Sequence, residues 1–214
     1  MSEHPTGLRE RKRQRTYRAI SDAAVALFLE KGFDRVSVSE IAEAAEVSKP
    51  TLFRYFPAKE DMALHRFADH EDEAARVVTG RPDGRTPLTA LEEHFLAGLR
   101  AHDPVTGLCD APEVLAFHRL LYGTPSLLAR LHTYTARSEE ALAAALERAA
   151  PDAERTALTA RVAAGQIVST QRVLATGNWR QIADGAAAAA LLPRAERDAH
   201  HAFALLRTGL AAYR

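Results

Sequence analysis

Hydrophobic residues recur near the start of the chain at spacings of three and four, the period of an amphipathic helix. Ile20, Ala24 and Phe28 share one face of this pattern, which predicts a helix over about residues 8–31. Gly32 follows the last turn, where a residue in the left-handed conformation commonly ends a helix. We therefore expect one long helix with a buried face at the start of the fold.

Two short helices are predicted directly after this long one. Ser37 and Glu40 have the spacing of a capping box, in which the serine hydroxyl accepts from the Glu40 backbone N–H and the carboxylate reaches back. Ser48 is placed to cap the next helix, and Pro50 fits its first turn because N–H groups there have no intrahelical partner. Only a tight turn around Val47 separates the two helices.

The rest of the chain continues the helical pattern in longer segments. Turn-forming residues separate them, as in the loop from Thr79 to Pro87 and at Gly177 and Asn178. No convincing strand pattern is present, so the predicted fold class is all-α. Further helices are predicted over about residues 59–78, 88–102, 112–122, 125–150, 152–176 and 193–213.

The composition agrees with a helical globular protein. Of the 214 residues, 47% are hydrophobic and 26% are charged, so a sizeable core can form. The single cysteine, Cys109, excludes an intramolecular disulfide. No apolar run approaches the ~20 residues that span a bilayer, and the N-terminus has no hydrophobic signal core. We expect a cytoplasmic protein with no membrane partner.

Positive charge gathers near the N-terminus, although the formal net charge is zero. A solvated basic tail would give the same sequence pattern, but a local concentration of cations is also typical of a DNA-facing end. Six cations lie in this segment, opposed there only by Glu10: Arg9, Arg11, Lys12, Arg13, Arg15 and Arg18.

Two short helices joined by a tight turn fit the helix-turn-helix motif, whose second helix enters the major groove of DNA. Ser48, Lys49 and Thr51 lie at the N-terminus of that second helix, where the dipole and free N–H groups favour a phosphate. Phe53 and Arg54 are expected to project from its exposed side, and an arginine can contact guanine with two hydrogen bonds. A helical hairpin without a nucleic-acid role is the alternative interpretation.

The run VSEIAEAAEVSKPTLFRYFPAKE at residues 38–60 resembles the signature of the TetR (tetracycline repressor) family. The run AVALFLEKGF at residues 24–33 is similar to the first helix of that family. The resemblance covers about residues 9–67, and it is specific because many positions match in order and spacing. It implies an N-terminal helix-turn-helix three-helix DNA-binding domain, residues 1–60, and a larger helical ligand-binding and dimerisation domain, residues 61–214.

The resemblance also implies which side chains touch DNA. Contacts mostly with phosphates are expected from Ser48, Thr51, Tyr55 and Lys59, and base-edge or near-base contacts from Lys49, Phe53 and Arg54. Arg13 of the basic segment is a further expected phosphate contact. The expected DNA-binding residues are Arg13, Ser37, Ser48, Lys49, Thr51, Phe53, Arg54, Tyr55 and Lys59. One position departs from the family, since Glu46 stands in the turn where glycine is usual; a non-glycine residue at positive φ costs on the order of 1 kcal/mol.

For the second domain the resemblance implies dimerisation and a ligand pocket. Candidate interface residues lie in the last two predicted helices: Val162, Ile167, Val168, Val173, Phe203, Leu206 and Leu210. An unknown small hydrophobic or aromatic ligand is expected in a pocket with a few polar groups. Its candidate lining is Phe95, Leu99, Phe117, His118, Leu121, Tyr122, Tyr134 and Gln166. Plain packing is the alternative for both sets.

The sequence gives no sign of catalysis. It has no G-x-S-x-G, Walker or Rossmann motif, and its histidines form no HxxxH pair, so neither an enzyme, nor a metal, nor a cofactor is expected. The predicted function is a ligand-responsive repressor that binds a palindromic operator as a dimer. A transcriptional activator, and an architectural DNA-binding protein without small-molecule control, remain open.

Overall fold

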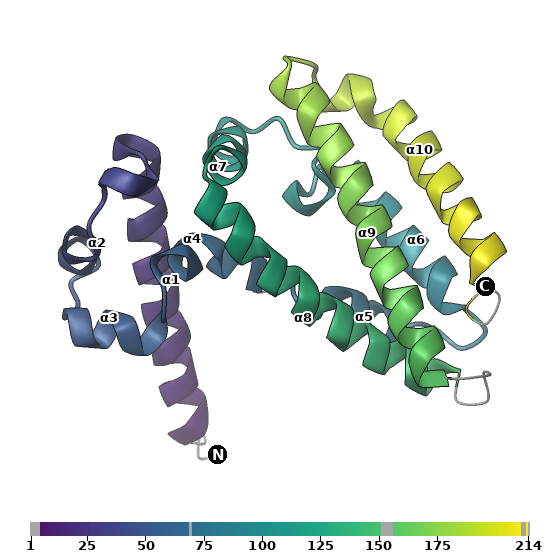
Figure 1. Ribbon diagram of the computed structural model, residues 1–214, viewed down its shortest axis with the longest axis horizontal. Coiled ribbons are helices and arrows are strands. Elements are labelled where there is room, and N and C mark those ends of the chain that lie inside the picture. The colour runs from purple at the N-terminus through teal and green to yellow at the C-terminus, as the bar shows by residue number, and fades with distance from the viewer. Residues whose placement is uncertain (1–4, 69, 151–155, 211–212, 214) are drawn as a thin grey trace. The chain divides into compact units, whose positions relative to one another are not determined.

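The computed structural model describes residues 5–68, 70–150, 156–210 and 213 (Figure 1). Each segment that the sequence predicts to be helical contains α-helix in these ranges. No strand occurs in these ranges, which confirms the all-α fold. The helices are α1 (Pro5–Lys31), η1 (Phe33–Arg35), α2 (Val38–Ala44), α3 (Lys49–Tyr55), α4 (Lys59–Ala68), α5 (Glu73–Thr79), α6 (Pro87–Arg100), η2 (Pro104–Thr106), α7 (Pro112–Gly123), α8 (Pro125–Ala149), α9 (Thr156–Ala183) and α10 (Ala188–Gly209). None of these helices is long and apolar enough to cross a membrane.

The chain forms two compact units, each with its own packing. The first comprises Met1–Ala68 and Ala116–Leu131; the second comprises Asp69–Leu115 and His132–Arg214. The domain boundary expected between residues 60 and 61 stays a prediction.

The first unit is built on the buried face of α1 that the sequence predicts. Ile20, Ala24 and Phe28 are fully buried, and α1 packs against α2 and α4. The Ser21 hydroxyl, also buried, donates to the Met62 backbone oxygen over 2.8 Å. This bond ties α1 to α4 and fixes the frame from which α2 and α3 project.

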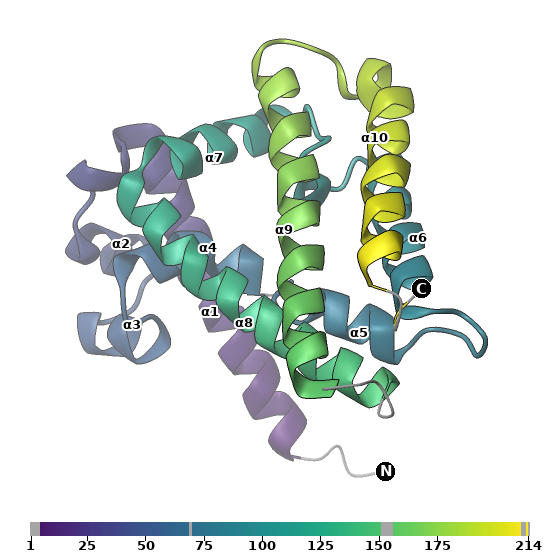
Figure 2. The same ribbon diagram turned by 45° about the vertical axis from the view of Figure 1, so that its right-hand side comes forward.

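The second unit has a core shared by α6, α9 and α10. Figures 1 and 2 both show α9 and α10 side by side, and α10 also packs along α6. Phe95 of α6 lies 6.4 Å from Phe203 of α10 between ring centroids. Beside them, the buried carboxylate of Glu92 accepts from Arg207 and pairs with His200. Burial of a carboxylate is tolerated here because it is paired.

Three predicted helix limits are wrong. The helix expected over residues 59–78 is two helices, α4 and α5, with a turn at 70–72. In the sequence Asp69, Glu71 and Asp72 precede Glu73, and repulsion between like charges together with the low helix propensity of aspartate disfavours one continuous helix. Acidic residues at the start of a helix are instead favourable, so α5 begins at Glu73.

Gly177 and Asn178 do not end a helix, because α9 continues through them to Ala183. The Asn178 side chain is buried, and its amide donates to the Thr106 backbone oxygen over 3.0 Å. A tertiary hydrogen bond therefore keeps this asparagine inside the helix, against its local preference for turns. The predicted start at Asp152 lies outside the described residues.

Pro193 lies inside α10 rather than at its start. The helix begins five residues earlier, at Ala188, whose backbone N–H donates to the Asp110 carboxylate over 2.9 Å. An alanine run and a cap supplied by another segment of the second unit together start the helix. Pro193 is the sixth residue of α10, so it lies beyond the first turn and removes one intrahelical hydrogen bond, the one that would end on the Ala189 oxygen.

Candidate nucleic-acid interface

The N-terminus of α2 has the capping box predicted from the sequence. The Glu40 N–H donates to the Ser37 hydroxyl over 3.2 Å, and the Ser37 N–H donates to the Glu40 carboxylate over 2.8 Å. Lys31, the last residue of α1, donates to the same carboxylate over 3.0 Å. The backbone N–H of Ser37 and the Lys31 ammonium lower the pKa of Glu40 to about 2. The joint between α1 and α2 is therefore fixed by charge as well as by packing.

The turn between α2 and α3 places Glu46 at a φ of 53°. The Val47 N–H donates to the Ala42 oxygen over 2.9 Å, and the Glu46 N–H donates to the Glu43 oxygen over 3.0 Å. These two bonds form a Schellman motif, whose left-handed position is usually glycine. The departure noted in the sequence therefore corresponds to a left-handed glutamate, and the helix end keeps its usual hydrogen bonds.

Ser48 caps α3, as predicted. Its hydroxyl accepts from the Thr51 N–H over 3.2 Å and lies 2.8 Å from the Thr51 hydroxyl. Leu52 is fully buried and Phe56 nearly so, so the opposite side of α3 is left to solvent. Figure 1 views α2 nearly end-on and α3 from the side, so their axes cross steeply, as in a helix-turn-helix.

The exposed side of α3 carries the side chains expected to contact bases. Lys49, Phe53 and Arg54 are all exposed, and Phe53 keeps 50% of its surface accessible. The Arg54 guanidinium lies over the Tyr55 ring, 5.7 Å from its centroid. Phe53 is half exposed between Lys49 and Arg54, and a phenylalanine in this position suits contact with a thymine methyl group.

Tyr55 at the end of α3 meets a residue that the sequence did not single out. The rings of Tyr17 on α1 and Tyr55 meet edge to face at 4.7 Å, and the Arg13 guanidinium lies 5.7 Å from the Tyr17 centroid. Arg13 itself is exposed. The spacing of four between Arg13 and Tyr17 was a possible signal, since residues so spaced share a helix face.

Lys59 is placed differently from the other expected phosphate contacts. Its ammonium donates to the Phe33 backbone oxygen and lies 4.3 Å from the Phe33 ring centroid and 5.4 Å from that of Phe28. Burial lowers the pKa of Lys59. This lysine joins α4 to η1 in the structure, so a phosphate contact requires it to exchange that partner.

The expected pocket residues fall in both units. Phe95, Leu99 and Tyr134 are buried in the second unit, whereas Gln166 is exposed on α9. The remaining four lie on the part of α7 that belongs to the first unit: Phe117, His118, Leu121 and Tyr122. His118 is buried, and this burial lowers its pKa.

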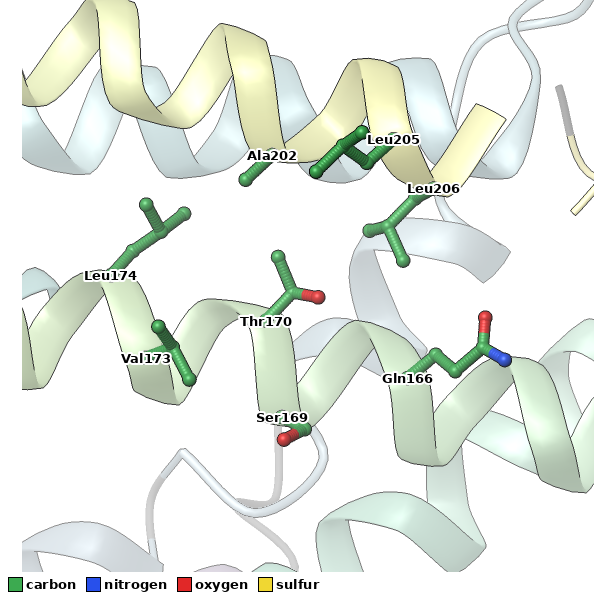
Figure 3. Close-up of a pocket in the computed structure, with 8 residues that line it drawn as sticks. All are labelled: Gln166, Ser169, Thr170, Val173, Leu174, Ala202, Leu205 and Leu206. Atoms are coloured by element: carbon green, nitrogen blue, oxygen red, sulfur yellow. The ribbon is translucent and has the colours of Figure 1, made fainter. Parts of the chain in front are cut away.

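Gln166 lines an open pocket of about 510 Å³ between α9 and α10 (Figure 3). In Figure 3, Leu174, Thr170 and Gln166 extend from α9 on one side, and Ala202, Leu205 and Leu206 extend from α10 on the other. Exposed apolar residues continue along these two helices: Leu158, Val162, Val173 and Leu205. A surface of this kind marks an interaction site more often than a solvent-facing one.

Part of the expected dimer interface is instead core. Ile167 and Phe203 are fully buried, and Leu206 and Leu210 are exposed by 7% and 6%. Ile167, Phe203 and Leu210 pack inside the second unit, whereas Leu206 is mostly buried but also lines the open pocket. The apolar period of α9 and α10 was correct, but both helices carry apolar residues on two faces.

Comparison with known proteins places the helix-turn-helix in a family. Residues 20–65 match the family model described as bacterial regulatory proteins, tetR family. The HTH-type transcriptional regulator TcmR of Streptomyces glaucescens is 38% identical over 135 residues, which cover 63% of this chain and 58% of TcmR. The chain thus matches somewhat more than half the length of this curated relative.

Solved structures share the fold over most of the chain. NalD, the secondary repressor of the MexAB-OprM multidrug efflux pump in Pseudomonas aeruginosa, is 21% identical with a TM-score of 0.52, covering 92% of this chain and 97% of NalD. A SmeT–triclosan complex is 15% identical with a TM-score of 0.52, covering 91% of each chain. The likeness to both is one of fold.

Proposed function

The chain belongs to the tetR family of bacterial regulatory proteins, and from this premise we propose that it is a dimeric, ligand-responsive repressor of a palindromic operator. The observation that carries the proposal is the exposed face of α3. There Lys49, Phe53 and Arg54 project from a helix that Ser48 caps and Leu52 anchors.

In this proposal α3 lies in the major groove. Lys49 and Arg54 contact base edges, and Phe53 packs on a thymine methyl group. The phosphate contacts come from the hydroxyls near the N-termini of α2 and α3 and from residues beside the C-terminal end of α3. These phosphate-binding residues are Arg13, Ser37, Ser48, Thr51, Tyr55 and Lys59.

The exposed apolar residues of α9 and α10 support the dimer. Leu158, Val162 and Val173 of α9 are exposed by 54%, 48% and 61%, and Leu205 of α10 by 60%. Joining two copies through this face removes that surface from water, and burial of apolar surface stabilises a complex by about 25 cal/mol per Å². A twofold dimer presents two recognition helices to a palindrome whose half-sites lie ~34 Å apart.

Ligand response is supported by the fold shared with the SmeT–triclosan complex and by the buried aromatic residues of the chain. We propose a small hydrophobic or aromatic ligand. The candidate lining residues are Phe95, Leu99, Tyr134 and Gln166 in the second unit, and Phe117, His118, Leu121 and Tyr122 in the first unit are candidates of their own. Binding shifts the population toward a dimer whose recognition helices no longer match the operator.

DNA binding is tested by selecting duplexes from a randomised library with the full-length protein and measuring affinity by gel shift. Arg54→Ala should cost about 1–3 kcal/mol and relax the selected sequence at one position in each half-site. Arg194→Ala, an exposed arginine on α10, is the control. Selection of the same sequence at the same affinity by Arg54→Ala would contradict the placement of α3.

Dimerisation is tested by sedimentation of Val162→Glu and Val173→Glu variants. We expect a shift to monomer and loss of cooperative binding to the selected palindrome, because each substitution buries a charge in the proposed interface. Val105→Glu is the matched control, since Val105 is similarly exposed at 42% but lies on η2. Variants that remain dimeric would place the interface elsewhere.

Ligand response and the sign of regulation need two further measurements. A thermal-shift screen of small aromatic and hydrophobic compounds should find one that stabilises the protein and releases it from the selected duplex. Transcription in vitro from a promoter that carries the selected site should fall when the protein is added. A rise would indicate an activator, and unchanged transcription an architectural protein.

A further inference from the structure

We propose that the DNA-binding surface continues from α3 onto the N-terminal turns of α1, where Tyr17 positions Arg13 and the basic turns bind phosphates that flank each half-site. The inference rests on the proposed DNA-binding function and adds a second contact region to it. It assigns a positioning role to Tyr17.

The N-terminal turns of α1 extend beyond the part of the helix that packs on the protein. Among the residues whose side chains are described, Ile20 is the first buried one, and every residue from 11 to 15 is exposed. Isolated helices shorter than ~12–15 residues are marginally stable in water. A helical extension without a protein core beneath it gains stability from a partner that covers it.

The charge of these turns identifies the partner as a polyanion. Five cations occupy residues 11–18, and no acidic residue stands between Glu10 and Asp22: Arg11, Lys12, Arg13, Arg15 and Arg18. At 1.5 Å per residue the segment is about 10 Å long, and one DNA strand advances about 3.4 Å along the duplex axis per phosphate. A segment of this length that lies along the duplex axis therefore spans about three phosphates of one strand.

Aromatic contacts connect this basic segment with the recognition helix. The Tyr17 ring stacks on His65 at 5.2 Å with an interplanar angle of 22°, and meets Phe56 edge to face at 5.2 Å. The ring also contacts Tyr55 of α3. Tyr17 is therefore held by residues of α3 and α4 and by Phe56, which directly follows α3. Arg13 lies over this fixed ring by a cation–π contact.

The order Arg13, Tyr17, Tyr55, Arg54 thus runs without a gap from α1 to α3. Because these contacts connect Arg13 with Arg54, we expect one polyanion to bind both, which favours the duplex already proposed for α3. An anionic membrane is disfavoured, because surface-binding helices insert large apolar side chains and residues 11–18 include only Tyr17 of that kind.

The test compares two duplexes selected with the full-length protein: one cut to the minimal site and one extended by flanking base pairs. The variants are Arg11→Gln/Arg13→Gln/Arg15→Gln, Tyr17→Ala and Tyr17→Phe. The control is Arg119→Gln/Arg148→Gln/Arg194→Gln, which removes the same charge from exposed arginines on α7, α8 and α10. Affinity is measured as a function of salt.

On the extended duplex the wild-type slope of log K against log salt should exceed that on the cut duplex by about 0.9 per additional phosphate contact. The arginine variant and Tyr17→Ala should lose this excess, whereas Tyr17→Phe and the control should keep it. Equal slopes on both duplexes, or an arginine variant with the wild-type slope, would overturn the inference. Arginine and Tyr17→Ala variants that lose affinity equally on both duplexes would also overturn it, because contacts with flanking phosphates cannot contribute on a duplex that lacks them.

Failure of the proposed function itself gives a different result. In that case the wild-type protein selects no duplex at all.

Discussion

Arg130 binds both carboxylate oxygens of Asp61 within the first unit, with Nε 2.7 Å from Oδ1 and Nη2 2.9 Å from Oδ2. The Asp61 side chain is only 7% exposed, and it also accepts the Ala58 N–H over 3.1 Å. Ala58 lies in the short connection between α3 and α4. The pair therefore joins the start of α8 to the connection that follows the recognition helix.

Removing the guanidinium should destabilise the first unit, because it leaves a buried carboxylate without its cation. We expect Arg130→Met to lower the free energy of unfolding by about 2–3 kcal/mol. This loss is smaller than for a fully buried ion pair, because the Arg130 side chain is 33% exposed. Arg76→Met, which breaks an exposed pair with Asp72, should cost about 0.5 kcal/mol or less. Urea unfolding measures both; equal losses would show that burial of Asp61 is unimportant.

Replacing Glu46 by glycine should stabilise the protein. A left-handed backbone costs a residue with a Cβ about 1–2 kcal/mol, so Glu46→Gly should gain about 1 kcal/mol after the entropy cost of glycine in the unfolded chain. Glu46→Ala removes the same carboxylate but keeps the strain, and it should gain little. Urea unfolding of the two variants separates the backbone effect from the charge, and equal gains would assign the effect to charge.

Local signals explain what the sequence predicts well. Ser37 with Glu40, Ser48 with Thr51, and Glu46 at its turn all act over a few residues, and the structure has each of them where the pattern indicates. Helix starts of this kind depend on side chains within one turn, so they can be recognised in a single sequence.

Contacts between distant residues explain what the sequence does not predict. Asp61 and Arg130 are separated by 69 positions, and Asp110 and Ala188 by 78. Neither the early start of α10 nor the pairing of Asp61 has a local signal. The same holds for the face of α9 that is buried, since packing against distant segments such as α10 and η2 makes Ile167 core and leaves Val173 exposed.

Stability should depend on pH through the carboxylate of Glu73, which lies 2.6 Å from His70 and 3.0 Å from His94. Hydrogen bonding to Glu73 raises the pKa of His94. A histidine whose pKa is raised in the folded state adds stability that is complete below its unfolded value of 6.5 and is lost as pH rises through the folded value.

We therefore expect His94→Gln to be less stable than wild type at pH 6 and to approach it as pH rises above the folded pKa. Stability would be measured by urea unfolding across this range. Asp103 and Arg76 also act on His94, with opposite signs, so ionic strength is held constant. His132→Gln, an exposed histidine on α8, should leave the pH profile unchanged. A His94→Gln difference that is constant with pH would indicate a packing effect alone.

Gly107→Ala should be among the most damaging single substitutions in the second unit. Gly107 has a φ of 71°, and a Cβ there would lie 1.9 Å from the Ala175 backbone oxygen of α9. The neighbouring Thr106 oxygen accepts from Asn178 on the same helix, so α9 cannot retreat without breaking that buried bond. The left-handed strain and the overlap together should cost about 3 kcal/mol or more.

Gly84→Ala, also at positive φ but with open space around it, isolates the backbone strain and should cost about 1 kcal/mol. Thermal unfolding of the two variants tests this difference, and equal losses would mean that η2 and α9 separate freely.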